Sequence, residues 1–316
     1  MNSPRSTFAR GLLALLLVPL PACDDRAPPD AGDRDREEAP GAGLEDAATA
    51  PPEPSRAPPP AAAPFRTDEE VHAALHAANP RYDRTGKFVF EDGALRVAEL
   101  TGAPLRDLSP LAGQPIVALD LGGTQVDDLS PLRGMPLETL LLDETPVSDL
   151  RPLAGMPLRV LRLFKTRVKD LSPLRGMPLV ELNLLGTAVS DLTPLESAPI
   201  QMLWLNETPV EDIRPLRRMP LVSLTLHRTR VHDLGPLIGS RLQRLHIAET
   251  PVSDLRPLKD LFLTRLIFSP GRIRDGMDVV RNMPSLQELG VRFEERHPPA
   301  VFWQLLDAGT LPAAEE

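Results

Sequence analysis

The chain of 316 residues contains one cysteine, one tyrosine and two tryptophans, and aromatic residues make up only 4% of it. Because Cys23 is the single cysteine, an intramolecular disulfide is excluded. The formal net charge of -9, with a sequence pI near 5.3, excludes the broad basic character that dominates binding to nucleic acids. We therefore expect no nucleic-acid partner.

Sequence motifs of common enzyme classes are also missing. The chain has no Walker phosphate loop, no dinucleotide-binding glycine fingerprint and no nucleophile elbow. His72 and His76 are four residues apart, but Ala73 stands where an H-E-x-x-H zinc site requires glutamate. We interpret both histidines as solvated helix residues, and we expect no catalytic activity, no cofactor and no bound metal.

The first 22 residues have the layout of a signal peptide. Arg5 and Arg10 precede an apolar run over residues 11–20, which is shorter than the roughly 20 residues that a membrane-spanning helix needs. The run ends in Leu20, Pro21, Ala22 and Cys23, which resembles the lipobox of bacterial lipoproteins. The resemblance implies that Cys23 becomes the lipidated N-terminus; the alternative is an incidental cysteine beside an ordinary secretory cleavage site.

Residues 23–64 carry this cysteine and a segment made almost entirely of alanine, proline, glycine and charged residues. From position 24 onward it contains ten acidic residues and four arginines, a net charge of -6. Such a composition cannot bury a core, so we predict a disordered acidic tether. Together these features predict an exported protein, lipid-anchored to a bacterial membrane, either on the periplasmic side of the inner membrane or in the outer membrane.

A motif of five residues, Asp-Leu-x-Pro-Leu, recurs every 21 residues through most of the remaining chain. It begins at Asp107, Asp128, Asp149, Asp170, Asp191, Asp212, Asp233 and Asp254, with Ile213 replacing leucine once. The full unit, LETLLLDETPVSDLRPLAGMP in residues 137–157, resembles the leucine-rich repeats of bacterial internalins, with threonine where asparagine is usual and one residue fewer. The resemblance covers residues 95–293.

Each position of the unit has a physical reason. Leucines alternate as in Leu140 and Leu142, which predicts a short strand with one buried face. The threonine hydroxyl, as in Thr145, should satisfy backbone groups in place of an asparagine ladder. The aspartate of the motif can hydrogen-bond nearby backbone N–H groups, and serine before proline, as in Ser172, predicts the N-cap of a single helical turn. Because every unit needs these residues, we interpret them as structural rather than catalytic.

The predicted fold is therefore an α/β solenoid, a leucine-rich-repeat arc with a parallel sheet on the concave side and short helical turns on the convex side. Helical caps should cover both ends, because a solenoid otherwise exposes its core there. We place the N-terminal cap in residues 65–94, with a capping box from Thr67 to Glu70, and the C-terminal cap and tail in residues 294–316.

The outward strand positions differ between repeats, and they are the candidate binding surface. A patch with several large apolar side chains should lie there, and exposed patches of this kind are typical of interaction sites. Its members are Leu141, Arg162, Phe164, Leu185, Trp204, Asn206, His227 and His246. The alternative is that these side chains only pack against each other on the surface.

Two functions remain open from the sequence. The first is an exported, membrane-anchored binding module that recognises a protein, or an extended polymer, through the concave sheet. The second is a passive scaffold or spacer of the cell envelope without a specific ligand. His227 and His246 fall diagonally on adjacent strands, but no third ligand is evident, so we do not expect a metal site there.

Overall fold

The computed structural model describes residues 63–311. The predicted signal peptide, the lipid site at Cys23 and nearly all of the predicted tether lie outside the described residues, as does the tail over residues 312–316.

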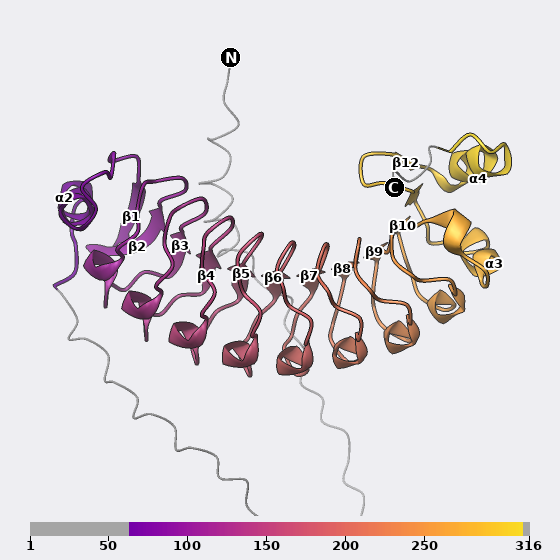
Figure 1. Cartoon of the computed structure of the whole chain (residues 1–316), viewed down its shortest axis with the longest axis horizontal. Helices are drawn as coiled ribbons and strands as arrows, with labels where there is room; N and C mark the ends of the chain where they lie inside the picture. Colours follow the sequence, from indigo (N-terminus) through magenta and orange to yellow (C-terminus); the bar gives the residue numbers. More distant parts are fainter. Residues whose placement is uncertain (1–62, 312–316) are drawn as a thin grey trace, which may run out of the picture. The chain divides into compact units, whose positions relative to one another are not determined.

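One sheet of twelve strands forms the concave side of residues 63–311, and its strands follow one another in sequence order (Figure 1). Neighbouring strands from β2 to β11 are parallel, whereas β1–β2 and β11–β12 are antiparallel hairpins at the two ends. The strands are β1 (Lys87–Glu91), β2 (Ala94–Glu99), β3 (Ala118–Asp120), β4 (Thr139–Leu141), β5 (Val160–Arg162), β6 (Glu181–Asn183), β7 (Met202–Trp204), β8 (Ser223–Thr225), β9 (Arg244–His246), β10 (Arg265–Ile267), β11 (Glu288–Gly290) and β12 (Arg296–His297).

The repeat leucines set the register of this sheet. Leu140 pairs with Leu161, and Leu161 pairs with Leu182, so equivalent leucines stack from strand to strand. All three are fully buried in one continuous hydrophobic core. A shift by one residue would turn this leucine row out of the core, which is why the alternation fixes the register.

Each repeat crosses the convex side in a single 3-10 turn, seen as short coils along the outer edge of the arc in Figure 1. The turns are η2 (Ser109–Leu111), η3 (Ser130–Leu132), η4 (Arg151–Leu153), η5 (Ser172–Leu174), η6 (Thr193–Leu195), η7 (Arg214–Leu216), η8 (Gly235–Leu237) and η9 (Arg256–Leu258), followed by η10 (Pro270–Arg272). A 3-10 turn is tighter than an α-helical turn and therefore fits within a repeat of only 21 residues.

The motif aspartates accept hydrogen bonds from backbone N–H groups at the turns, as predicted, but the prediction that serine is the N-cap is wrong. In η5 the Asp170 carboxylate accepts a hydrogen bond of 2.8 Å from the backbone N–H of Ser172, and the serine hydroxyl donates to that same carboxylate. Arg151 and Gly235 occupy the serine position elsewhere, and their N–H groups still donate to the preceding aspartates. Only the aspartate is common to all units, so it supplies the cap.

The threonine hydroxyls satisfy backbone groups, as predicted from the sequence, and each does so within its own repeat. The hydroxyl of Thr187 donates to the carbonyl oxygen of Leu184 in its own repeat, at 2.7 Å, and the equivalent threonines repeat this bond. These hydroxyls do not bond to the neighbouring repeat in the described part of the chain. Each threonine therefore shapes its own turn, and the backbone ladder joins one repeat to the next.

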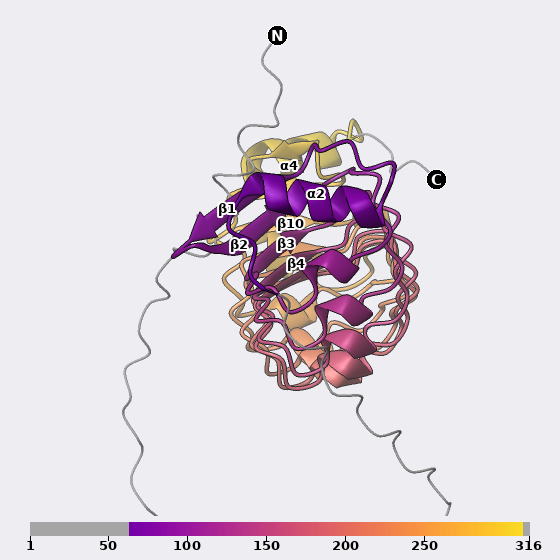
Figure 2. The same cartoon turned by 90° about the vertical axis from the view of Figure 1, so that its left-hand side faces the viewer.

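Helix α2 (Asp68–Ala78) covers the first repeats, crossing the near end of the arc in Figure 2. Thr67 accepts from the N–H of Glu70, as the capping box predicts. Asn79 then ties the helix to the first repeat, because its side chain accepts from Arg106 N–H and donates to the Asp107 carbonyl.

Of the two cap histidines predicted to be solvated, His76 is exposed and His72 is half-buried. Nδ1 of His72 lies 2.9 Å from the hydroxyl of Tyr82, and its ring packs edge-on against Phe88. His76 is exposed, but its Nδ1 lies 3.1 Å from the Tyr82 carbonyl oxygen. Both rings therefore fasten the chain after α2 to the helix.

Helices α3 (Met277–Arg281) and α4 (Pro299–Asp307) cover the other end of the core. Phe302 is fully buried against Phe268, and Trp303 packs edge-on against Phe302. The guanidinium of Arg281 lies 4.6 Å from the Trp303 ring centre and also pairs with Asp307. Trp303 therefore belongs to the core of this end and not to the concave surface.

Candidate functional site

The concave sheet presents two outward rows of side chains in its strands. In the row that contains Trp204, each residue pairs with its counterpart on the next strand. That row consists of Glu99, Asp120, Leu141, Arg162, Asn183, Trp204, Thr225, His246, Ile267 and Gly290. A second row begins two residues earlier, and the residues two positions later lie at the edge of the same face.

The structure brings the eight predicted patch residues onto this one face, but it does not expose all of them. Leu141 and His246 are only 4% and 8% exposed, whereas the other six are half-buried. The prediction that Leu141 forms part of an exposed apolar patch is therefore wrong. On a concave surface, side chains from adjacent strands converge, and a residue flanked by large neighbours loses its solvent contact.

The open apolar surface is a smaller cluster on three consecutive strands, which we call the central patch: Phe164, Leu185 and Trp204. Phe164 and Leu185 stand two residues after Arg162 and Asn183, which are register partners, so they are neighbours across β5 and β6. Trp204 pairs with Asn183 on β7. The ammonium of Lys165 lies 4.8 Å from the Phe164 ring centre and gives the patch a cationic edge.

A buried ion pair borders the central patch, and sequence reasoning missed half of it. Glu181 is 3% exposed, and its Oε1 accepts from Nε and Nη2 of Arg162 at 3.0 and 2.8 Å. Glu181 occupies an outward position of β6, next to Val160 of β5. The sequence shows an outward glutamate on the strand that follows an outward arginine. Only the register of the two strands shows that these side chains meet.

The two concave histidines form a stacked pair at β8 and β9. Their ring centres lie 4.9 Å apart with an angle of 16° between the planes. Nε2 of His227 lies 3.1 Å from Oε1 of Glu249, whose other oxygen accepts from Nε of Arg228 at 2.7 Å. The glutamate therefore fixes His227 in place.

His246 is the more constrained member of the pair. Burial lowers its pKa from 6.5 to about 4, the neighbouring His227 lowers it further, and Glu249 opposes this shift. His246 is therefore neutral near pH 7. Its Nε2 is buried without a hydrogen-bond partner in the structure, and so is Oγ1 of its cross-strand neighbour Thr225.

Carboxylates gather at the N-terminal end of the same face. Glu99 and Asp120 are register partners on β2 and β3, and Asp143 lies two residues after Leu141, the partner of Asp120 at the end of β4. Burial raises the pKa of Glu99 and of Asp143, because the cost of desolvating each carboxylate outweighs the opposing effects of Lys87 on Glu99 and of the Phe164 N–H and Arg162 on Asp143. The concave sheet therefore begins with carboxylates and continues into the central patch.

Metal-ligating side chains do not gather on this face. Within residues 63–311, no group of three or more histidine, cysteine, aspartate or glutamate residues is arranged to hold a metal ion. His232, the remaining histidine near the pair, is exposed and lies in the segment that leads to η8.

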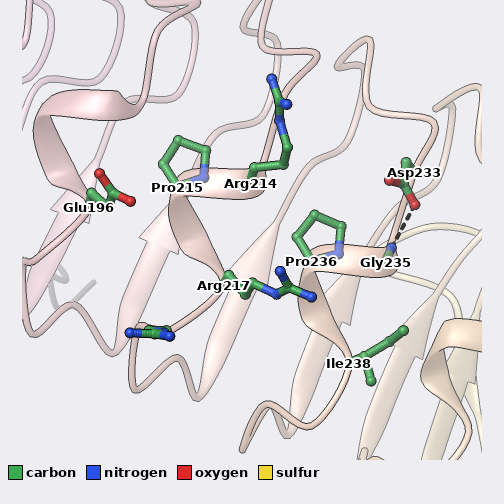
Figure 3. A pocket seen from close by; sticks show the side chains of 9 residues that line it. Glu196, Arg214, Pro215, Arg217, Asp233, Gly235, Pro236 and Ile238 are labelled. Carbon is green, nitrogen blue, oxygen red and sulfur yellow. Dashed lines mark hydrogen bonds between the residues drawn. The ribbon is translucent and has the colours of Figure 1, made fainter. Parts of the chain in front are cut away.

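A depression of about 630 Å³ lies on the opposite, convex side, between turns η7 and η8 (Figure 3). Pro215 and Pro236 stand on its two walls, and Arg217 and Ile238 reach toward solvent at its edge. Of its two acidic residues, Glu196 and Asp233, the latter is engaged as the cap of η8. The lining offers no nucleophile with an adjacent base, so we do not assign a reaction to it.

Comparison with known proteins identifies the architecture. No protein-family model matches the chain, and no match was found among the curated proteins. Among solved structures, an internalin (inlF) of Listeria monocytogenes matches with a TM-score of 0.58 and 20% identity, over 72% of this chain and 71% of that one. The fold is a leucine-rich-repeat arc.

A second solved structure supports the same assignment. Internalin C2 of Listeria monocytogenes matches with a TM-score of 0.52 and 20% identity, over 68% of this chain and all of that chain. At this identity the likeness concerns the leucine-rich-repeat fold alone. Among residues 63–311, no helix has the length and apolar character needed to span a membrane.

Proposed function

We propose that the protein is a binding module that recognises another protein through the concave sheet of its leucine-rich repeats, and that it does not act as an enzyme. The observation that carries this proposal is the central patch. Phe164, Leu185 and Trp204 are half-buried apolar side chains at outward positions, where the repeat requires no apolar residue. Partly exposed aromatic side chains in the centre of a surface are the usual anchors of protein interfaces.

The surroundings of the central patch suit the same role. The Arg162–Glu181 pair and the Glu249–His227 bond hold polar side chains in fixed positions beside it. A surface that is ordered before binding loses less conformational entropy when a partner docks. The similarity of the fold to internalins is in keeping with a recognition module but does not identify the partner.

We test this proposal with the full-length, tagged protein and its Phe164→Ala/Trp204→Ala variant. Proteins that co-purify from detergent-solubilised envelopes are identified by mass spectrometry, and each candidate is then purified and its Kd measured. We expect the double variant to weaken binding at least about tenfold, because anchor residues contribute 2 kcal/mol or more each.

A matched control removes apolar surface elsewhere. Ile238 and Phe262 are 64% and 78% exposed and lie outside the sheet strands, so Ile238→Ala/Phe262→Ala should leave the Kd unchanged. Equal recovery of every protein by the wild type and both variants would contradict the proposal. It would favour the alternative, a passive scaffold of the envelope.

We further propose that Cys23 is lipidated and that the lipid holds the exported protein at a bacterial membrane. This rests on the signal-peptide layout before Cys23 and on the lipobox-like sequence that ends there. Two or more acyl chains would make the attachment stable. We expect Cys23→Ser to move the protein from the membrane fraction to the soluble fraction and to remove the lipid mass from its N-terminal peptide. Lipidation would be contradicted if the N-terminal peptide of the wild type carried no lipid mass and Cys23→Ser left the membrane fraction unchanged.

A further inference from the structure

The concave sheet also has a cationic end, on strands β9 and β10. Arg244 and Arg265 are register partners, so two guanidinium groups start from adjacent positions on the same face. Arg265 pairs with Glu288, and Arg296 approaches the same carboxylate at 3.8 Å. Arg244 is exposed and has no ion pair in the described part of the chain. Like charges on directly opposed strand positions repel, so this arrangement favours an added anion.

Beside this arginine stand two buried polar atoms without partners. His246 follows Arg244 by two residues on β9 and therefore shares its face of the sheet. Nε2 of His246 and Oγ1 of its register partner Thr225 are both buried without a hydrogen bond in the structure. Buried polar groups almost always find a partner, so two orphans in register contact point to a group that arrives from outside.

An alternative is that carboxylates of this chain pair with Arg244 and with the two unpartnered atoms. The geometry does not support it. Glu249, the nearest carboxylate, is already shared between His227 and Arg228. Glu288 is shared between Arg265 and Arg296. Glu249 and Glu288 are therefore both engaged by other side chains, and neither forms an ion pair with Arg244.

We propose that Arg244, Thr225 and His246 form a subsite for an acidic side chain of the protein partner. The guanidinium of Arg244 makes the first contact, because it is the exposed member. Thr225 and His246 donate hydrogen bonds to the same carboxylate after a side-chain adjustment that uncovers them, with His246 protonated at Nε2 in its neutral form. Bonds from a guanidinium to a carboxylate are among the strongest in protein interfaces.

This inference rests on the proposed function and adds an orientation to it. The carboxylates Glu99, Asp120 and Asp143 occupy the opposite end of the face, and the central patch lies between the two ends. An acidic group of the partner is repelled at β2–β4 and attracted at β9. The partner therefore docks with its acidic edge toward the C-terminal cap.

The test uses two end-blocked peptides as probes of the full-length protein: hexaglutamate and hexaglutamine. Affinity is measured by calorimetry at low salt, and the side-chain NMR signals of His246 locate the binding. We expect hexaglutamate to bind at least about tenfold more tightly than hexaglutamine, and to shift the His246 signals. Arg244→Gln should reduce the hexaglutamate affinity about tenfold.

Two further variants separate the subsite from general charge effects and from misfolding. Arg217→Gln removes the same charge from the convex side and should change the affinity less than twofold, within the range of a screened, distant charge. Thr225→Val removes the orphan hydroxyl, so it should weaken hexaglutamate binding while the melting temperature stays equal or rises.

The outcomes distinguish this inference from the proposed function. Equal affinity for hexaglutamate and hexaglutamine, or equal losses in Arg244→Gln and Arg217→Gln, would overturn the acidic subsite. In that case the Phe164→Ala/Trp204→Ala experiment still decides whether the central patch binds a protein. Conversely, hexaglutamate binding that depends on Arg244 supports the subsite by itself, whichever result the central patch gives.

Discussion

The carboxylate of Glu181 is buried on the concave sheet, and the guanidinium of Arg162 is its cationic partner. Removing Arg162 leaves a buried charge unpaired, so we expect Arg162→Leu to lower the free energy of unfolding by about 3 to 5 kcal/mol. Chemical denaturation measures this loss. Adding Glu181→Gln should restore much of it, and an unchanged midpoint in the single variant would mean that Glu181 is solvated.

His246 gives the protein a specific response to pH. Its folded pKa, about 4, is below the ordinary 6.5, so the folded state binds a proton less readily than the unfolded state. The stability that follows from a neutral His246 is fully present above pH 6.5 and is lost as the pH falls toward 4. The shift corresponds to about 3 kcal/mol between these limits.

We expect the unfolding free energy of the wild type to fall over this window more than that of His246→Gln, which cannot titrate there. The raised pKa values of Glu99 and Asp143 act in the opposite direction, because their protonation favours the folded state. The difference between wild type and variant isolates the histidine, since both proteins carry these carboxylates. Parallel pH profiles for the two proteins would be incompatible with a buried neutral His246.

At this scale the sequence predicted the face of each candidate residue but not its surroundings. Trp204 and Phe164 were correctly placed on the concave side by the alternation of the strand. The burial of Leu141 and the pairing of Glu181 depend on residues about one repeat away in the chain. No local pattern contains that information.

The structural unit of this protein is the repeat, and the buried core leucine of each repeat is the main source of stability. Leu182 lies at the centre of β6 between Leu161 and Leu203 and is fully buried. We expect Leu182→Ala to lower the free energy of unfolding by about 2 to 5 kcal/mol, because the stacked strands on both sides hold the cavity open.

Trp204→Ala is the matched comparison for this prediction. Trp204 is half-buried and faces the concave side, so its removal leaves no closed cavity and should cost clearly less than Leu182→Ala. Thermal and chemical unfolding of the two variants, measured side by side, test the difference. A larger loss for the tryptophan variant would place its side chain in the core.

The turn elements show why local sequence rules were only partly sufficient. Serine before proline has the composition of an N-cap, yet Asp170 supplies the cap of η5 and Ser172 is the first residue of the turn. An aspartate two residues before a backbone N–H can form this bond wherever the chain bends tightly. A serine cap and an aspartate cap place the start of the helical turn one or two residues apart. Only the backbone geometry distinguishes between them.

On the scale of the whole molecule, a solenoid of equal units should tolerate the loss of one unit. Deleting residues 180–200 joins Leu179 to Gln201 and preserves the spacing of the core leucines. Because each repeat packs only against its neighbours, we expect a folded protein with a lower melting temperature. Circular dichroism during heating measures this.

A deletion of half that length is the control. Removing residues 180–189 deletes strand β6 but leaves turn η6 in the chain, so the remaining half-repeat breaks the spacing and should abolish cooperative unfolding. If both deletions unfolded alike, the repeats would not be interchangeable units. The full-unit deletion also removes Leu185 from the central patch, so partner binding should weaken although the fold remains.

The amino-acid pattern is sufficient to predict the period, the buried face of each repeat strand and the order of these strands. Because the core leucines recur once per unit, successive repeats can bury them only by stacking on one another in chain order. The tertiary structure decided which outward residues are open, which are paired and which are orphaned. These properties arise between strands that lie next to each other in space and about 21 residues apart in the chain, and the curvature of the sheet determines how closely their side chains converge.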